Sequence, residues 1–305
     1  MEKWRFFPIL VKENIVNNMS IRDIVIFAKC SKKCQNLLTV VPIHLPSTLI
    51  DVCLFVGLRH RLSAQHVGSF VNFSILATSR KFYIDQLKLN ILTEESENEV
   101  KDFIEKLKKA RNSLKVKELS MVIEVDHEEL ITGILSVCDP SRIESIEIPK
   151  LYSQEVYDEI VKTPQWINSK RVSLNCIFYQ RLTMPNVNFD DFLHFESVQL
   201  LVERLDTDDL VKFIQNFCNS SEHARFVIQC REPMQQDLIR QKIEAGWVGN
   251  WQQNLHTNTV FVIDPAKPDH VFDIYCSSYF LHGGWSLLHE FNERQRFIQD
   301  LFVLH

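Results

Sequence analysis

The sequence predicts an α/β fold in which a short helical segment precedes a solenoid of strand–turn–helix repeats. Two observations indicate the repeats: a triplet with apolar first and third residues recurs every 26 to 28 residues between residues 119 and 228, and segments with helical apolar spacing lie between several of its copies. A doubly wound sheet also alternates strands and helices, but it usually needs Gly-rich turns. The 305 residues include only 7 glycines and no Gly-rich phosphate loop, which disfavours that fold.

Composition excludes several classes of function. The chain has 34 Lys and Arg against 39 Asp and Glu, a net charge of −5, which disfavours a nucleic-acid binder and adhesion to anionic membranes. There is no secretory signal and no apolar run near the roughly 18 residues of a membrane helix. The eight cysteines contain no Cys-x-x-Cys pair, so we expect reduced, buried thiols and a cytoplasmic and/or nuclear location.

The N-terminal forty residues predict two or three short helices. Apolar residues share one side of a first helix from about Leu10 to Asn18. Ser20 and Asp23 have the spacing of a capping box for a second helix. So short a segment cannot bury this much apolar surface alone, so it packs on the rest of the chain or on a partner.

This segment resembles an F-box. The matching residues keep the family spacing without insertion: Phe7-Pro8, Ile15-Val16, Met19, Asp23-Ile24, Ala28 and Cys30-Ser31-Lys32. Three features depart from the family pattern: Phe7 replaces the Leu before Pro, Leu10 replaces a Glu, and a late Trp is absent. The alternative is a helical hairpin that only plugs the core of the following domain.

The F-box resemblance implies docking on a Skp-type adaptor and, through it, on a cullin. Helix-on-helix burial of apolar anchors would supply the affinity, with a few residues dominating the energy. The candidate adaptor-binding residues are Pro8, Ile15, Val16, Met19, Ile24 and Val25.

The stretch from residue 90 to 230 predicts a repeat. Residues 94–113 have the pattern of one solvated helix, with acidic residues at its start and basic residues at its end. The five triplets are Leu119-Ser-Met121, Ile146-Glu-Ile148, Val172-Ser-Leu174, Val198-Gln-Leu200 and Phe226-Val-Ile228, and an earlier strand is expected at Leu87-Lys-Leu89. Helices are expected over 128–136, 154–161 and 207–217, with Asp126 and Asp206 as caps. This period fits an irregular leucine-rich-repeat-like solenoid.

The same stretch resembles the FTH domain found behind F-boxes in a large nematode family. The residues that carry this resemblance are 114–119, 139–148, Gln165-Trp166 to Lys170, and His194-Phe195-Glu196. The expected organisation is an F-box-like segment over 1–45, connecting elements over 46–90, the repeat domain over 91–230 and its C-terminal extension over 231–305. Residues 260–305 are expected to add strands and a terminal helix.

In such a solenoid, alternate strand residues face outward on a concave sheet. The candidate target-binding residues on that face are Glu118, Ser120, Glu147, Arg171, Ser173, Asn175, Gln199, Arg225 and Gln229. Their mixed polarity favours recognition of a protein segment. Together the two resemblances imply the F-box substrate-recognition subunit of a ubiquitin ligase; the alternative is a protein-binding repeat scaffold uncoupled from a ligase.

We expect no enzyme activity, no catalytic residues, no metal site and no cofactor. The sequence has no Gly-x-Ser-x-Gly elbow and no His-x-x-x-His pair. Trp166 follows Pro164 where a strand is expected to begin, and it is more simply explained as a packing anchor than as a site residue. His194 is more simply explained as a turn residue. Gly283-Gly284, the only glycine pair, is expected in a tight turn. The expected partners are the adaptor with its cullin and an unidentified target protein, with no nucleic acid and no membrane.

Overall fold

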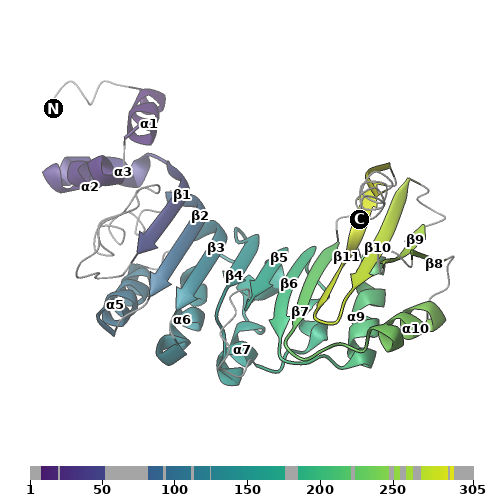
Figure 1. Cartoon of the computed structure of the whole chain (residues 1–305). Coiled ribbons are helices and arrows are strands. Elements are labelled where there is room, and N and C mark those ends of the chain that lie inside the picture. The colour runs from purple at the N-terminus through teal and green to yellow at the C-terminus, as the bar shows by residue number, and fades with distance from the viewer. Residues whose placement is uncertain are drawn as a thin grey trace, which may run out of the picture. The chain divides into compact units, whose positions relative to one another are not determined.

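The computed structural model forms two compact units, Met1–Ser169 and Lys170–His305, which we call unit one and unit two. Figure 1 labels their helices and strands. The structure describes residues 8–19, 21–51, 82–91, 94–110, 113–123, 125–175, 185–220, 224–246, 251–254, 259–263, 269–287 and 289–291. The division after Ser169 falls inside the repeat domain expected over 91–230. The four domain ranges taken from the sequence stay predictions.

Unit one begins with three short helices, α1 (Ile9–Asn17), α2 (Ile21–Cys30) and α3 (Lys32–Val40). The hydroxyl oxygen of Ser31 accepts a hydrogen bond of 3.2 Å from the backbone N–H of Cys34 and caps α3. Helix α2 packs against α3, and α1 contacts the first strand. The first two helices were predicted from apolar spacing; the predicted cap, Ser20, lies outside the described residues.

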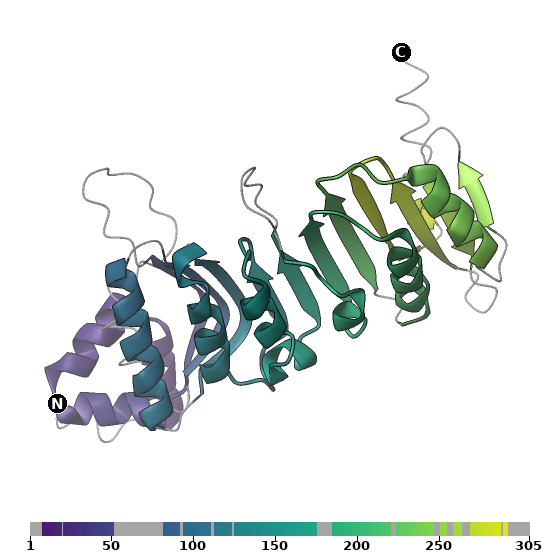
Figure 2. The same ribbon diagram turned by 90° about the horizontal axis from the view of Figure 1, so that it is seen from below.

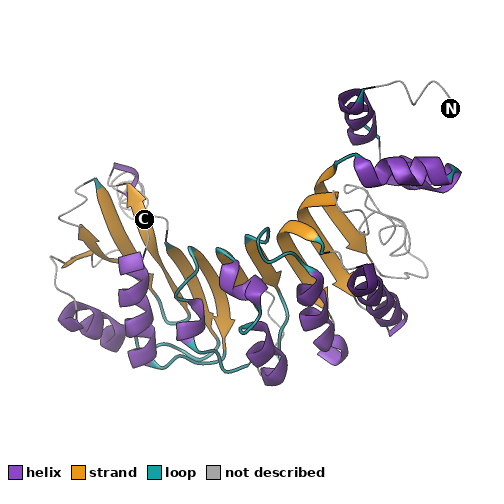
Figure 3. Ribbon diagram, turned by 180° about the vertical axis from the view of Figure 1, so that it is seen from behind, coloured by secondary structure: helices purple, strands orange, loops and turns teal. Residues whose placement is uncertain are grey.

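A parallel sheet follows in unit one. Its strands are β1 (Ile43–Asp51), β2 (Phe82–Ile91), β3 (Lys115–Ile123) and β4 (Ser145–Ile148), paired in the order of the sequence. The helices of this part are α5 (Glu94–Ala110), the 3-10 turn η2 (Val125–His127), α6 (Glu129–Val137), α7 (Gln154–Ile160) and α8 (Pro164–Asn168). Seen from below and from behind, α5, α6 and α7 lie over one face of this sheet (Figures 2 and 3).

Unit two has a mixed sheet. Strands β5 (Arg171–Leu174), β6 (Ser197–Val202) and β7 (Arg225–Cys230) are parallel, and β11 (Phe280–Leu287), β10 (His270–Cys276), β9 (Thr259–Ile263) and β8 (Trp251–Asn254) continue antiparallel from β7. The helices are the 3-10 turn η3 (Phe189–Phe192), α9 (Thr207–Ser220) and α10 (Gln236–Gly246). The strands expected beyond residue 260 are confirmed, whereas most of the expected terminal helix lies outside the described residues.

All five predicted triplets lie in strands, and their apolar residues are buried. In unit two, the ring of Phe226 on β7 packs edge-on against Phe213 and Phe217 of α9, with ring centroids 5.6 and 5.7 Å apart. The apolar face of each strand is therefore the face covered by helices. The strand–helix alternation is confirmed within each unit, and a leucine-rich-repeat-like solenoid over the whole domain stays a prediction.

Three local expectations are corrected. Asp126 lies inside η2, and α6 begins after Glu128 without a side-chain cap. The region around Trp166, where a strand was expected, is the helix α8, because Thr163 accepts a hydrogen bond from the N–H of Trp166 and Pro164 occupies the first helical turn. Gly283-Gly284 lies within β11 and not in a turn.

Candidate functional site

Helices α1 and α2 expose apolar side chains. Leu10 is 73% exposed, Val11 and Ile15 are each 38% exposed, and Ile26 is 51% exposed. Val11, Ile15 and the half-buried Met19 are spaced by four residues, so they follow one side of the helix and its end. We call Leu10, Val11, Ile15, Met19 and Ile26 the N-terminal apolar surface. Apolar surface left exposed in this way is typical of a protein interaction site.

The six predicted adaptor-binding residues do not share one environment. Pro8 and Ile15 are exposed and Met19 is half-buried. Val16 and Ile24 are 0% and 1% exposed and belong to the core of unit one, so the prediction that they contact an adaptor is corrected. Helical periodicity turns them away from Ile15 and Ile26. The side chain of Val25 lies outside the described residues.

The face of the unit-one sheet opposite the helices carries polar side chains. Glu118, Ser120 and Glu147 are all half-buried, as expected from their alternation with buried neighbours on β3 and β4. Gln86 on β2 donates a hydrogen bond of 3.4 Å to the Glu118 carboxylate. At the start of the strands, the Lys115 ammonium lies 4.7 Å from the centre of the Tyr83 ring.

The corresponding face of unit two carries Arg171, Ser173, Gln199, Arg225 and Gln229. Gln199 and Arg225 are exposed, and the other three are half-buried. Asn175 was predicted on this face, but it is 3% exposed and has a backbone φ of 57°. The chain turns through the left-handed region there, which Asn tolerates better than most residues, so Asn175 ends β5 and is not an exposed contact residue.

Sequence reasoning missed an aromatic cluster in unit two. Tyr275 on β10 stacks on His282 of β11 with ring centroids 5.3 Å apart, and Phe280 lies edge-on to His282 at 5.7 Å. All three rings are half-buried. The nearly continuous apolar run of 271–276 was available as a strand signal, but the pairing of β11 with β7 could not be read from the sequence.

A pair of lysine–glutamate contacts repeats along the chain. In unit one, the N–H of Glu144 donates to the carbonyl oxygen of Lys117 at 2.8 Å, and their charged groups lie 3.6 Å apart. In unit two, the N–H of Glu196 donates to the carbonyl oxygen of Lys170 at 2.7 Å, and the charged groups lie 3.7 Å apart. Glu144 and Glu196 stand directly before β4 and β6, whereas Lys117 is the third residue of β3 and Lys170 stands directly before β5. Each contact therefore joins the start of one strand to the strand that it pairs with.

The distinctive short motifs also have structural roles. Trp166 is 1% exposed and Phe195 is 2% exposed, and Gln165 is a buried hydrogen-bond donor to the carbonyl oxygen of Cys138. His194 is exposed, with its ring centroid 4.0 Å from that of Phe195. The interpretation of Trp166 as a packing anchor and of His194 as a turn residue therefore agrees with their positions.

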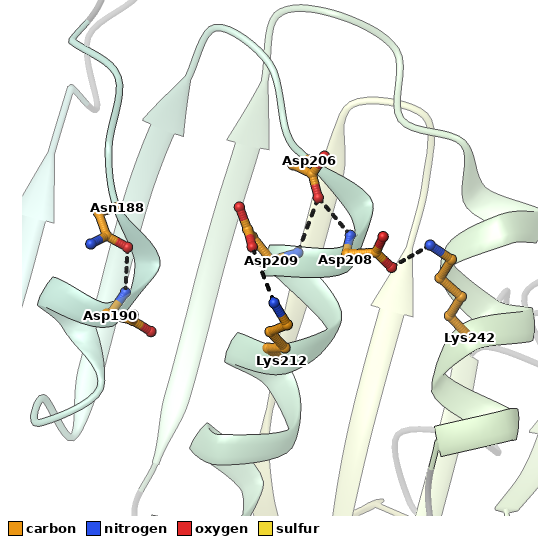
Figure 4. A network of polar contacts seen from close by, with 7 residues as sticks. All are labelled: Asn188, Asp190, Asp206, Asp208, Asp209, Lys212 and Lys242. Carbon is orange, nitrogen blue, oxygen red and sulfur yellow. Dashed lines mark hydrogen bonds and ion pairs between the residues drawn. The ribbon is translucent and has the colours of Figure 1, made fainter.

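A polar network joins α9 to α10 in unit two (Figure 4). Asp206 accepts hydrogen bonds from the N–H groups of Asp208 at 2.8 Å and Asp209 at 3.1 Å, which confirms it as the cap of α9. The bonds from Asp209 and Asp208 lower the pKa of the Asp206 carboxyl. Lys242 of α10 pairs with Asp208. The network is explained by helix capping and helix packing.

A cavity of about 170 Å³ lies near the carboxyl ends of β6 and β7. Its lining residues include Thr207, Cys230, Met234 and Gln235. It is smaller than the roughly 300–1,000 Å³ of pockets that bury drug-sized ligands. Burial raises the pKa of the Cys230 thiol, so its neutral form is favoured and it is a weak nucleophile. The cavity does not assemble catalytic groups.

Two other buried thiols are also held in their neutral forms. Burial raises the pKa of Cys138 to about 12 and that of Cys276 to about 11. Within the described ranges, no group of three or more His, Cys, Asp or Glu side chains could hold a metal ion. The described helices include none with the length and apolar character needed to cross a membrane.

Two family models match the chain. The model of the F-box domain matches residues 4–46, which include α1, α2 and α3, and the model of the FTH domain matches residues 97–241. No curated protein and no solved structure matches it. Both resemblances expected from the sequence are therefore confirmed, and the N-terminal apolar surface lies within the F-box range.

Proposed function

We propose that this chain, which belongs to the F-box proteins that carry an FTH domain, is a substrate-recognition subunit of a Skp/cullin-RING ubiquitin ligase. In this role it has no catalysis of its own: the F-box helices hold the adaptor, and the sheet faces hold a target protein. It acts in the cytoplasm and/or the nucleus, where such ligases work.

The observation that carries the proposal is the exposure of apolar side chains inside the F-box range. Leu10, Ile15 and Ile26 are left open to solvent while Val16 and Ile24 fix the helices to unit one. Burying three such side chains against a partner removes apolar surface from water, at about 1.5–3 kcal/mol for each that becomes fully buried. An adaptor with an apolar groove supplies that surface.

The target protein is proposed to bind the sheet faces opposite the helices. In unit one these faces offer Glu118, Ser120 and Glu147, and in unit two they offer Arg171, Ser173, Gln199, Arg225 and Gln229. Carboxylates, amides, hydroxyls and guanidinium groups are all present, so the faces can select a partner by charge and hydrogen bonding.

Binding of the purified adaptor to Ile15→Asp tests the first step. We expect the variant to lose at least about tenfold in affinity, about 1.4 kcal/mol, with an unchanged melting temperature. Ile167→Asp is the matched control, because Ile167 is 57% exposed on α8 and outside the F-box range. Ile24→Asp is unsuitable, since it places a carboxylate in the core.

Two results would contradict the proposal. A folded wild-type chain that does not bind the adaptor would leave a protein-binding scaffold uncoupled from a ligase. Equal losses of affinity in Ile15→Asp and Ile167→Asp would show that the N-terminal apolar surface is not the docking site.

A further inference from the structure

Two arginines flank a serine on the outer face of unit two. Strand register places Arg171 beside Ser197 and Ser197 beside Arg225. Val172, Val198 and Phe226, the next residues on these strands, are buried, so the row of Arg171, Ser197 and Arg225 lies on the face opposite the helices. The Arg225 Nε donates a hydrogen bond of 3.3 Å to the Ser197 hydroxyl oxygen, which orients the guanidinium across the strands.

The aromatic cluster lies on the same face. Val227 pairs with His282, and His282 pairs with Tyr275, so these residues form the next row on this face. Leu281, Ile274 and Cys276 point the other way and are buried. Tyr275, Phe280 and His282 therefore present partly exposed ring faces beside the arginine row.

The arginine row and the aromatic cluster are one diagonal step apart across the pair of strands β7 and β11. Arg225 pairs with Gly284, and His282 precedes Gly284 by two residues. Diagonal neighbours across an antiparallel pair lie about 7–8 Å apart. Gly284 pairs with Arg225 on one side and with Asp273 on the other, so Asp273 is the next side chain in register beyond Arg225, and the rings lie in the neighbouring row.

The strands of this sheet carry more arginine than acidic side chains on this face, although the chain carries a net charge of −5. Among strands β5, β6, β7, β10 and β11, the acidic residue is Asp273. It is 8% exposed, and its carboxylate accepts a hydrogen bond of 3.1 Å from the Ser286 hydroxyl. The carboxylate of Glu196, just before β6, pairs with Lys170. Two arginines against one aspartate leave these five strands with a net positive charge.

We propose that this face binds an extended acidic segment of the target protein, in which a carboxylate pairs with Arg225 and Arg171 and an apolar or aromatic side chain two residues away packs on Tyr275, Phe280 and His282. In an extended chain, residues two apart are separated by about 6.6 Å, which matches the diagonal step. Guanidinium groups bind carboxylates through paired hydrogen bonds, and ring faces bind apolar side chains. The inference rests on the proposed target-binding role and specifies the partner.

Selection of random twelve-residue displayed peptides on the purified full chain tests it. We expect enriched peptides to carry Asp or Glu two residues from Phe, Tyr, Trp or Leu. The double variant Arg171→Glu, Arg225→Glu should instead enrich Lys or Arg, and should bind a wild-type-selected peptide at least tenfold more weakly. The control Lys212→Glu, an exposed residue of α9 on the helix side, should change that affinity less than twofold.

Several outcomes would overturn the inference. The first two are enriched peptides that lack an acidic residue and a double variant that still selects the same peptides as the wild type. The other two are an RNA oligonucleotide that competes with the selected peptide at equal affinity, and a wild-type dimer that the two substitutions dissociate. Adaptor binding is measured on the same preparations. If the chain does not bind the adaptor but still selects acidic peptides, only the ligase role is contradicted. If it binds the adaptor but does not select acidic peptides, only this inference is contradicted.

Discussion

The side-chain amide of Gln165 donates a hydrogen bond of 2.7 Å to the backbone carbonyl oxygen of Cys138. Cys138 is the residue that ends α6, and Gln165 lies in the first turn of α8, directly before the buried Trp166. The Gln-Trp pair thus joins two helical segments that are 27 residues apart in the chain. Gln165 satisfies a buried carbonyl, and Trp166 fills the space beside it.

Gln165→Ala is expected to destabilise the protein by about 1–3 kcal/mol, because it leaves the buried Cys138 carbonyl without its donor. Chemical denaturation monitored by circular dichroism measures the change. Asn168→Ala is the control, since Asn168 is exposed on the same helix. Equal stabilities for the two variants would show that the bond contributes nothing.

Glu128→Gln is expected to lower stability with a characteristic pH dependence. The carboxylate is 2% exposed and accepts hydrogen bonds from the N–H groups of Tyr152 and Ser153, at 2.9 and 2.7 Å. Glutamine replaces one carboxyl oxygen with an NH2 group that cannot accept, whereas the hydroxyl oxygen of a protonated Glu128 still can, so one N–H loses its partner at any pH, at about 1–3 kcal/mol.

Burial nevertheless raises the pKa of the Glu128 carboxyl above its ordinary value, and the backbone hydrogen bonds lower it by less. The unfolded chain then ionises first as the pH rises, so ionisation of Glu128 reduces the stability of the wild type between its unfolded and folded pKa values. The stability difference between wild type and Glu128→Gln is therefore largest below that window and smaller above it. Unfolding at several pH values checks the direction, with Glu159→Gln at an exposed position on α7 as control.

Asp206→Ala is expected to lower the melting temperature, and Asp206→Asn to change it less. Asn keeps an oxygen that can accept from the N–H groups of Asp208 and Asp209, whereas Ala has none. Because the pKa of Asp206 is lowered in the folded state, its contribution is present above its ordinary pKa and is lost as the pH falls through the folded value. The difference in melting temperature between the wild type and Asp206→Ala should therefore become smaller in acid. A difference that does not change with pH would contradict capping by the ionised carboxylate.

Gly283→Ala is expected to destabilise unit two by about 1–3 kcal/mol. An added Cβ would lie 2.6 Å from Cζ of Phe226 and 3.0 Å from the carbonyl oxygen of Asp273, so the buried ring must move. Gly133→Ala is the informative control, because its Cβ would meet the end of the flexible Ile104 side chain at 3.0 Å. Thermal unfolding should separate the two, since alanine is favoured over glycine inside a helix such as α6.

Alkylation at neutral pH should distinguish the cysteines. Cys30 is exposed on α2, whereas Cys138 and Cys276 are buried with pKa values of about 12 and about 11. Because the thiolate is the reacting form, Cys30 should be modified with iodoacetamide at least tenfold faster in the native protein. Mass spectrometry of the labelled peptides gives each rate, and the difference should disappear in denaturant. Fast native labelling of Cys138 would indicate local opening of the end of α6.

Local apolar spacing was sufficient for much of the fold. The first two helices, the long helix α5, the five triplet strands and the Asp206 cap were predicted, because helix and strand periodicity and capping depend on residues close in sequence. Both family resemblances rest on the same short-range patterns. The alternation of Glu118, Ser120 and Glu147 with buried neighbours was likewise a local property.

Contacts between distant residues decided the rest. Val16 and Ile24 are apolar like Ile15, and only the packing of unit one shows that they are buried while Ile15 is exposed. The aromatic cluster of Tyr275, Phe280 and His282 lies beside the arginine row because β11 pairs with β7, about fifty residues earlier in the chain. Loop closure and long-range burial determine this pairing, and no local sequence pattern encodes it. The sequence by itself determined most of the elements and both domain resemblances; the tertiary structure decided which side chains remain available to a partner.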